Sequence, residues 1–274
     1  MNQSQSTAQA SESSSLSEPL LALKGFSKSF GAVEALKDVD FELRAGEVVG
    51  LVGDNGAGKS TLIKAIAGVQ PPDEGEARFE GQPVNLNSPQ AATALGIATV
   101  YQDLALAENL DVVANLFLGQ EVADGWPGVD VLDEASMEHK SMELLGSLGV
   151  TTLRSVRTEV ADLSGGQRQA VAIARSLLGE PKVVLLDEPT AALGIVQTQE
   201  ILKLVERLRE RELGVIVISH NLANVFTVAD RIVVLRLGRL VASFDARDVR
   251  REDVVGAITG AEFGDERPTE EAPL

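Results

Sequence analysis

Residues 53–60 carry the clearest chemistry, because they read Gly-Asp-Asn-Gly-Ala-Gly-Lys-Ser. In the spacing G-x-x-x-x-G-K-S, glycines let the backbone turn tightly and direct several N–H groups inward. A helix that begins near Lys59 would add its positive N-terminal end. Lys59 would then bind the β- and γ-phosphates of a nucleoside triphosphate, and the Ser60 hydroxyl would ligate Mg²⁺. An apolar run at 48–52 precedes the loop, and this context argues against a chance glycine-rich turn.

Two adjacent carboxylates end a second apolar run. The run from Val183 to Leu186 predicts a buried strand, and Asp187 and Glu188 follow it. Ligands of α/β sheets bind at the carboxyl ends of strands. Asp187 would hold Mg²⁺, and Glu188 would orient the attacking water or accept its proton. Alone, the pair is equally compatible with two solvated carboxylates, and the phosphate loop upstream favours the catalytic interpretation.

A third stretch reads Ser164-Gly165-Gly166-Gln167. Ser164 would cap the helix that follows, and the two glycines would let a ligand approach the backbone closely. The N–H groups at a helix N-terminus form an anion site. In isolation, an ordinary helix cap is the better interpretation of such a stretch.

These residues must be positioned by an α/β framework. Strands are expected at 21–30, 39–43, 48–52, 77–79, 82–84, 183–186, 215–219, 232–235 and 240–242. Helices are expected from Ser60 to Ala67 and from about 196 to 212. The order strand, helix, strand between 183 and 219 predicts a βαβ unit with a parallel sheet.

The remaining segments divide the chain into parts. Residues 104–147 are helical and polar in pattern, with a break at 125–128, and this predicts an inserted helical lobe. The Ser-rich residues 1–19 and the acidic residues 262–274 predict disordered tails. The folded domain is therefore expected to span 20–261.

The composition limits the classes of function. The chain has 274 residues, of which 44% are hydrophobic, enough for one core with an inserted lobe. A net charge of −17 disfavours nucleic acid as a partner. The sequence has no cysteine, so disulfides and thiolate metal sites are excluded. No apolar run approaches the roughly 20 residues that cross a bilayer, so any membrane connection is expected through a partner.

Taken together, the stretches resemble the ATP-binding subunits of ABC (ATP-binding cassette) transporters. Leu163–Gln167 matches the signature sequence of that family, Gly53–Ser60 its first nucleotide motif and Val183–Glu188 its second. The resemblance runs from about residue 21 to 260. It implies an α/β fold of the P-loop NTPase type: a RecA-like core with a mostly parallel sheet, an N-terminal antiparallel β subdomain and an α-helical subdomain inserted at about 104–168.

The resemblance also implies roles for single residues. Gln102 occupies the position of the glutamine loop, where it would reach Mg²⁺ or water and sense the membrane partner. His220 occupies the position of the switch histidine, which contacts the γ-phosphate and helps to position the water. Phe30 occupies the position of the aromatic residue that stacks on adenine. Outside this context, a surface glutamine, a structural histidine and a core phenylalanine are the ordinary interpretations.

The full implied site can be stated by role. The implied catalytic residues are Glu188, His220, Lys59 and Gln102. The implied ATP-binding residues are Phe30, Gly53, Asp54, Asn55, Gly56, Ala57, Gly58, Lys59, Ser60, Thr61, Ser164, Gly165, Gly166 and Gln167. The implied Mg²⁺ ligands are Ser60, Gln102 and Asp187. One departure is Gly194, where the family often has an aspartate that makes a polar contact between paired nucleotide domains.

Residues 101–106 and 108–110 resemble those of bacterial monosaccharide importers of the ribose, xylose and fructose type, in their single-cassette form. This implies a head-to-tail homodimer in which ATP hydrolysis drives sugar uptake through separate transmembrane permease subunits. An extracytoplasmic sugar-binding protein would deliver the sugar. The chain would lie at the cytoplasmic face of the cell membrane, bound peripherally through the permease, with no nucleic-acid partner. The alternatives are an ABC exporter subunit, a soluble non-transport ABC ATPase and a nucleotide-binding module without hydrolysis.

Overall fold

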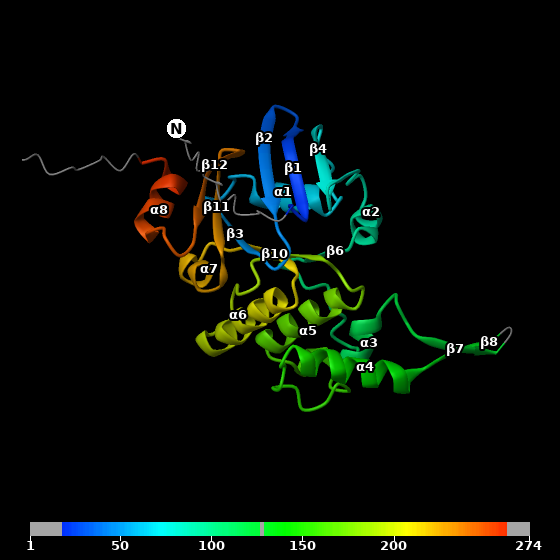
Figure 1. Ribbon diagram of the computed structural model, residues 1–274. Helices are drawn as coiled ribbons and strands as arrows, with labels where there is room; N and C mark the ends of the chain where they lie inside the picture. Colours follow the sequence, from blue (N-terminus) through cyan, green and yellow to red (C-terminus); the bar gives the residue numbers. More distant parts are fainter. Residues whose placement is uncertain (1–17, 127–128, 262–274) are drawn as a thin grey trace, which may run out of the picture.

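The computed structural model describes residues 18–126 and 129–261. The upper part of the molecule in Figure 1 is rich in strands, and the lower part is mostly helical. Nearly all of the two predicted tails falls outside the described residues, so their disorder stays a prediction. Within the described ranges, no helix is long and apolar enough to cross a membrane.

The central sheet has six strands in the order β12-β11-β3-β10-β9-β6. Its strands are β3 (Val48–Val52), β6 (Ile97–Val100), β9 (Val183–Asp187), β10 (Gly214–Ile218), β11 (Arg231–Arg236) and β12 (Arg239–Asp245). All pairs are parallel except β11 with β12. Every residue of β3 and β10 is buried, as the apolar runs predict for strands covered on both faces. The predicted βαβ unit is confirmed, since β9 and β10 are parallel neighbours.

A second sheet is antiparallel and has four strands in the order β2-β1-β4-β5. Its strands are β1 (Leu21–Phe30), β2 (Val33–Leu43), β4 (Glu74–Phe79) and β5 (Gln82–Val84). The predicted N-terminal antiparallel β subdomain is thereby confirmed. Strand β2 begins at Val33, earlier than the expected residue 39. The first residues of β2 are exposed and pair with β1 through irregular register, so no buried alternation marks them in the sequence.

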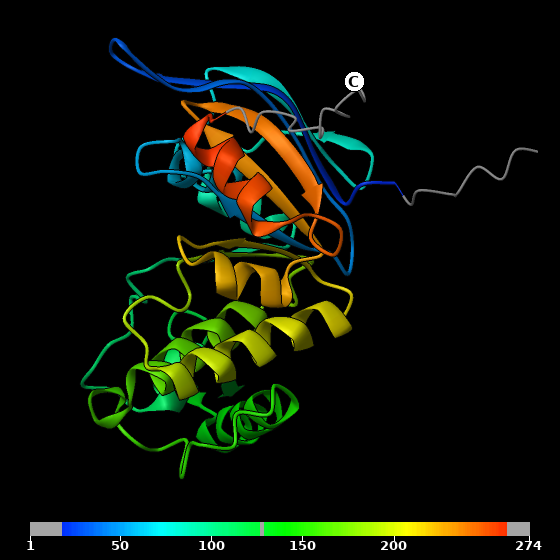
Figure 2. The same cartoon turned by 90° about the vertical axis from the view of Figure 1, so that its left-hand side faces the viewer.

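Helices surround and underlie the central sheet. Their bounds are α1 (Lys59–Ile66), α2 (Pro89–Ala94), α3 (Val112–Phe117), α4 (Glu134–Ser147), the 3₁₀ turn η1 (Val160–Asp162), α5 (Gly165–Leu177), α6 (Ile195–Glu210), α7 (Leu222–Val228) and α8 (Arg251–Thr259). One apolar cluster joins α3, α4, α5 and α6 to the lower face of the sheet. A second cluster fills the space between the two sheets around α1. Figure 2 shows these layers from the side, with α5 and α6 below the sheet.

The stretch 104–147, predicted as helical with a break at 125–128, contains a hairpin. β7 (Ala123–Trp126) pairs with β8 (Val129–Leu132) as an antiparallel ribbon, which projects from the lower part in Figure 1. The first half of the expected break, Gly125 and Trp126, ends β7, and residues 127–128 lie outside the described residues. Its strands are only four residues long. Val131 and Leu132 are 60% and 55% exposed. Because these two consecutive apolar residues are both exposed, the sequence shows no alternation of apolar and polar residues that would indicate a strand.

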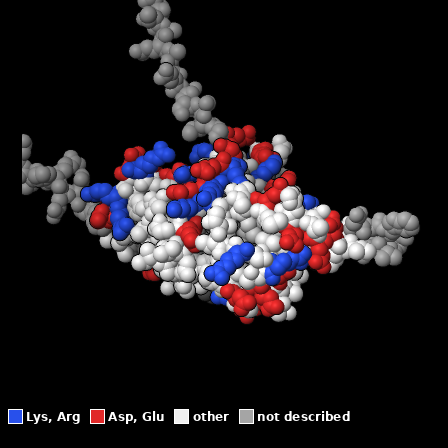
Figure 3. Space-filling view, turned by 90° about the horizontal axis from the view of Figure 1, so that it is seen from below, with Lys and Arg blue, Asp and Glu red and all other residues white. Residues whose placement is uncertain are grey.

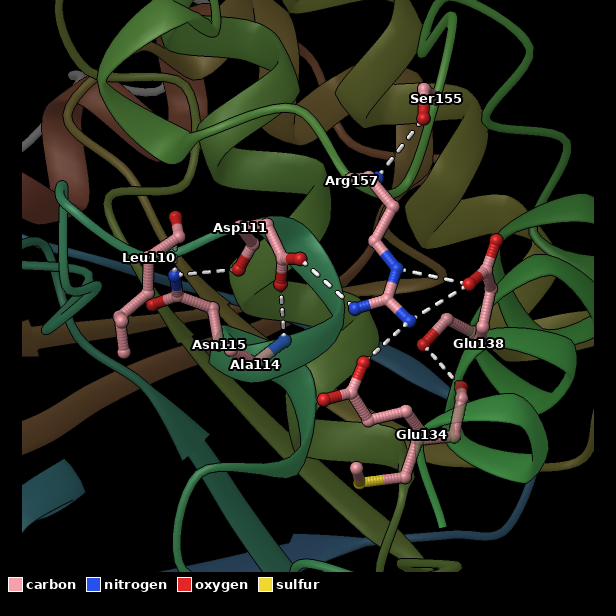
Figure 4. A network of polar contacts seen from close by, with 10 residues as sticks. Leu110, Asp111, Ala114, Asn115, Glu134, Glu138, Ser155 and Arg157 are labelled. Carbon is pink, nitrogen blue, oxygen red and sulfur yellow. Dashed lines mark hydrogen bonds and ion pairs between the residues drawn. The ribbon is translucent and has the colours of Figure 1, made fainter. Parts of the chain in front are cut away.

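Arg157 connects the start of α3 to α4 through ion pairs. Its guanidinium lies 2.9 Å from a carboxylate oxygen of Glu138, 3.2 Å from Glu134 and 3.4 Å from Asp111 (Figure 4). Asn115, on the same helix as the Asp111 cap, is fully buried. Its side chain bonds to the backbone of Ala107 and of the residues that begin α3. These contacts fix the chain that leads from residue 107 into the helical subdomain.

Candidate nucleotide-binding site

The loop at 53–58 lies between β3 and α1, as the spacing predicts. Two of its glycines are required by close contacts and by left-handed backbone. A Cβ on Gly53 (φ 154) would lie 2.2 Å from the carbonyl oxygen of Leu235. A Cβ on Gly58 (φ 107) would lie 2.5 Å from the carbonyl oxygen of Ala35. Any side chain at either position would push the loop away from the neighbouring strands.

Lys59 reaches back over this loop. Its Nζ donates to the carbonyl oxygens of Gly53 (2.8 Å) and Asp54 (2.9 Å). Burial lowers the pKa of the ammonium, and the negative charges of Glu188, Asp54 and Asp187 oppose that shift. The ammonium is therefore held at the centre of the loop by neutral carbonyls, where a bound anion would strengthen its charged form.

Asp187 ends β9 beside the loop. Burial raises the pKa of its carboxyl, the charge of Glu188 raises it further, and Lys64 and Lys59 oppose the shift. Glu188 has left-handed backbone (φ 51), which is uncommon for a residue with a side chain. Its N–H donates to the carbonyl of Ile218 at the end of β10, and this fixes the turn. The turn therefore holds Glu188 beside the carboxyl end of β10, the parallel neighbour of β9.

The Glu188 carboxylate is held by His220. The backbone N–H of His220 donates to Oε1 at 3.0 Å, and Nδ1 of its ring lies 2.9 Å from Oε2. The side chain of Glu188 is only 15% exposed, whereas that of His220 is 74% exposed. Both residues follow the carboxyl ends of neighbouring parallel strands, which explains how residues 32 positions apart meet. The histidine ring could thus move toward solvent while Glu188 stays in place.

An open cleft of about 590 Å³ brings most of the predicted residues together. Those lining it are Phe30, Asn55, Gly56, Ala57, Gly58, Lys59, Ser60, Thr61, Gln102, Asp187 and Glu188. Gly53 and Asp54 instead supply the carbonyls that bind Lys59. His220 lines a neighbouring hollow of about 270 Å³ next to Leu193 and Ile195. Phe30 is 45% exposed at the edge of the cleft, so the structure places it outside the core.

The cleft also contains residues that sequence reasoning missed. These are Val33, Glu34, Ala35, Lys37, Ile218 and Leu237. Leu237 has left-handed backbone (φ 49) and is 70% exposed in the β11–β12 turn. The next residue, Gly238, donates to the carbonyl of Ala57 and accepts from Lys37 N–H. Only the fold brings this turn to the phosphate loop, so no local signal could have placed it there.

The stretch Ser164–Gln167 starts α5. The Ser164 hydroxyl accepts from Gln167 N–H at 3.3 Å, and the Gln167 side chain accepts from Ser164 N–H at 2.9 Å. Leu193 and Gln197 press against Gly165 and Gly166, where an added Cβ would lie 3.1 and 2.9 Å from them. None of these four residues lines the phosphate-loop cleft. One copy of the described chain thus presents the two predicted halves of the site on separate surfaces.

The donors around the cleft suit a hard cation. Ser60, Gln102 and Asp187 offer a hydroxyl, an amide oxygen and a carboxylate, the oxygen donors that Mg²⁺ prefers. Within the described ranges, no three histidine or acidic side chains form a metal cluster. A site with one carboxylate is consistent with Mg²⁺ held partly by water and by the phosphates of a nucleotide.

This arrangement of parallel sheet, phosphate loop and strand-end carboxylates defines a P-loop nucleotide-binding protein. The sequence pattern of the ABC transporter family matches residues 36–191. The fructose import ATP-binding protein FrcA of Rhizobium meliloti is 46% identical over 89% of this chain and 95% of its own. The xylose/arabinose import ATP-binding protein XylG of Sulfolobus acidocaldarius is 44% identical over 89% of this chain and 96% of its own.

Solved structures agree with this match. The ADP conformation of an ATP-binding cassette of an ABC transporter superposes with a TM-score of 0.74 at 26% identity, covering 89% of this chain and 96% of that one. A dimeric post-hydrolysis cassette bound to ADP and Pi gives a TM-score of 0.68 at 27% identity, covering 84% of this chain and 100% of that one. The chain belongs to the ABC transporter family of ATP-binding proteins.

Proposed function

We propose that this protein is the ATP-hydrolysing subunit of an importer that takes up a monosaccharide. The observation that carries the proposal is the cleft in which Lys59, Gln102, Asp187 and Glu188 meet beside the phosphate loop. The sugar class is supported by relatives named for fructose and for xylose/arabinose import, each matched along nearly its whole length. The chain would act at the cytoplasmic face of the membrane through permease subunits. An extracytoplasmic sugar-binding protein would deliver the sugar to those subunits.

The proposed role of each residue combines its position at the cleft with the family resemblance. The phosphate-loop N–H groups and Lys59 bind the β- and γ-phosphates, and Phe30 stacks on the adenine. Ser60, Gln102 and Asp187 hold Mg²⁺, which neutralises charge on the phosphates when bound. Glu188 orients the attacking water, because its carboxylate lies at the cleft and is held in place by the turn after β9. His220 releases its contact with Glu188 and turns to the γ-phosphate.

A second copy completes the site. The Ser164–Gln167 helix start would offer the N–H groups of Gly165 and Gly166 to phosphate, but in one chain it does not line the cleft. In a head-to-tail homodimer, this surface of one copy would cover the γ-phosphate bound by the other. Each ATP would then be held between two chains, so binding closes the pair and hydrolysis opens it.

The rival classes find less support in the observations. The face seen in Figure 3 mixes basic side chains with acidic ones and offers no continuous positive surface for a nucleic-acid backbone. An exporter subunit would keep the same cleft, but the relatives reported above are named as import proteins. A module without hydrolysis would not need Glu188 and His220 held in contact.

The proposal can be tested in cells that lack the endogenous protein. Uptake is measured with radiolabelled fructose, xylose and ribose. Such cells should fail to take up the one sugar that this protein serves, and the wild-type chain should restore its uptake. Lys59→Ala should not restore uptake, because the phosphates lose their cationic partner. Normal uptake of all monosaccharides without the protein, or full rescue by Lys59→Ala, would refute the function.

A further inference from the structure

A short segment joins the nucleotide cleft to the helical part of the molecule. Gln102 lines the cleft, while Leu104 and Ala105 line a separate hollow of about 520 Å³ beside β6 and α5. Ala105 has left-handed backbone (φ 48), which is uncommon for a residue with a side chain. Its N–H reaches only Asp103 Oδ1, at 3.3 Å. The segment therefore holds a strained conformation that its local contacts explain only in part.

Arg175 supplies the missing support. Its Nη2 donates to the carbonyl of Leu104 at 2.9 Å, and its Nη1 donates to the carbonyl of Ala105 at 2.8 Å. Burial lowers the pKa of the guanidinium, and within the described ranges no carboxylate offsets this cost. A planar fork can bridge two consecutive carbonyls in a fixed geometry, which a lysine or glutamine cannot reproduce. The half-buried guanidinium thus acts on the backbone of this segment.

The same helix connects the segment to the second half of the site. Arg175 lies in the last turn of α5, and Ser164 caps the first turn. The 13 residues of this helix span roughly 20 Å. α5 also packs against α3, the helix that follows this segment, and Asn115 of α3 donates to the carbonyl of Ala107. A displacement of Gln102 would consequently reach Ser164–Gln167 through one rigid element.

We propose that Arg175 is a positioning residue for hydrolysis: by gripping the Leu104 and Ala105 carbonyls, it presents Gln102 to the cleft and ties it to α5. This inference rests on the proposed function of the cleft. It predicts that loss of Arg175 slows turnover through Gln102 and leaves ground-state binding of ATP nearly unchanged.

The test is a double-mutant cycle on phosphate release by the purified full chain. Arg175→Gln should lower kcat about tenfold and change KM for ATP less than about twofold, because the phosphate loop is untouched. In a Gln102→Ala background, the same substitution should lower kcat further by less than about twofold. Arg175→Lys keeps the charge without the fork, and its kcat should fall between those of wild type and Arg175→Gln.

Arg157→Gln is the matched control, since it removes ion pairs of the helical part without touching the segment. It should leave kcat near the wild-type value. If Gln102→Ala lowers kcat but Arg175→Gln has the same full effect in both backgrounds, the inference fails and the proposed function stands. If Gln102→Ala leaves kcat unchanged, the proposed role of Gln102 fails and this inference fails with it. Should Arg175→Gln not fold, Arg175→Lys in both backgrounds decides by the same criterion.

Discussion

At the scale of single residues, the contact between Glu188 and His220 is central to the proposed chemistry. Glu188 sits in left-handed backbone and its carboxylate is mostly buried, so its position is set before nucleotide arrives. His220 is mostly exposed and is free to turn. Residue type and motif context predict Glu188 from sequence, whereas His220 is assigned only through the family resemblance. Their contact depends on two parallel strands becoming neighbours, and local sequence does not encode that.

The first prediction concerns Glu188→Gln. The amide keeps the size of the side chain but cannot accept a proton, so turnover should fall about 10²–10⁴-fold, the usual contribution of a general base. Affinity for ATP, measured by fluorescence with a labelled nucleotide, should stay within a few-fold of wild type. Turnover near the wild-type rate would assign the activation of water to another residue.

The second prediction concerns Asp187. Its carboxyl has a raised pKa in the folded protein, so the folded state binds more protons than the unfolded state between the ordinary and the raised pKa. Stability from this group is therefore present below the ordinary pKa, near about 3.9, and is lost as pH rises through the raised value.

Asp187→Asn should accordingly raise the melting temperature of the nucleotide-free protein, and more so at pH 8 than at pH 3.5, which lies below the ordinary pKa of about 3.9. Differential scanning calorimetry at the two pH values measures this. Asp162→Asn, at an exposed carboxylate of η1, serves as the control and should show no such difference. A gain for Asp187→Asn that is equal or larger at pH 3.5 would contradict the assigned direction of the pKa shift.

At the scale of elements, the chain between residue 102 and α3 forms no helix or strand, and side chains supply hydrogen bonds to its backbone. Asn115 is fully buried and satisfies backbone groups of Ala107, Leu110 and Asp111. Nothing in the sequence around Asn115 predicts this, since a lone asparagine in a short helix is ordinarily exposed. The strand and helix cores, by contrast, were predictable because their apolar runs match the burial that the fold gives them.

The third prediction is that Asn115→Ala destabilises the protein by about 2–4 kcal/mol, since it leaves several buried backbone groups without partners. Urea unfolding followed by circular dichroism gives the free energy of unfolding. Asn109→Ala, at an exposed asparagine of the same connection, should change it by less than about 0.5 kcal/mol. Equal stability of the two variants would show that the buried contacts of Asn115 contribute nothing.

The hairpin β7–β8 marks the limit of sequence reasoning at this scale. The helical subdomain was expected from polar, helix-type periodicity, and α3 and α4 lie within it. The hairpin has short strands with exposed apolar residues, so neither burial nor length separates it from a loop. Elements whose stability comes mainly from their own pairing are the ones that burial patterns do not reveal.

At the scale of the whole molecule, the separation of the two half-sites is the central feature. The phosphate loop opens into the cleft, whereas Ser164–Gln167 faces elsewhere on the same chain. Gly194 caps α6 beside Ser164–Gln167 without a side chain of its own, and its N–H is bound by Gln197 at 2.8 Å. The polar contact that an aspartate would make here between copies is therefore missing, and the apolar side chains that follow, Ile195 and Val196, are 86% and 73% exposed.

The most direct measurement is the mass of the Glu188→Gln protein by analytical ultracentrifugation, with Mg²⁺ and ATP, with ADP and without nucleotide. If the triphosphate is held between the phosphate loop of one chain and the start of α5 of another, the protein should be a dimer with Mg²⁺ and ATP. It should be a monomer with ADP and without nucleotide. Adding Gly165→Asp, which places a negative charge at the phosphate contact, should restore the monomer while ATP still binds. A monomer with saturating ATP, or a dimer that ignores nucleotide, would contradict the account.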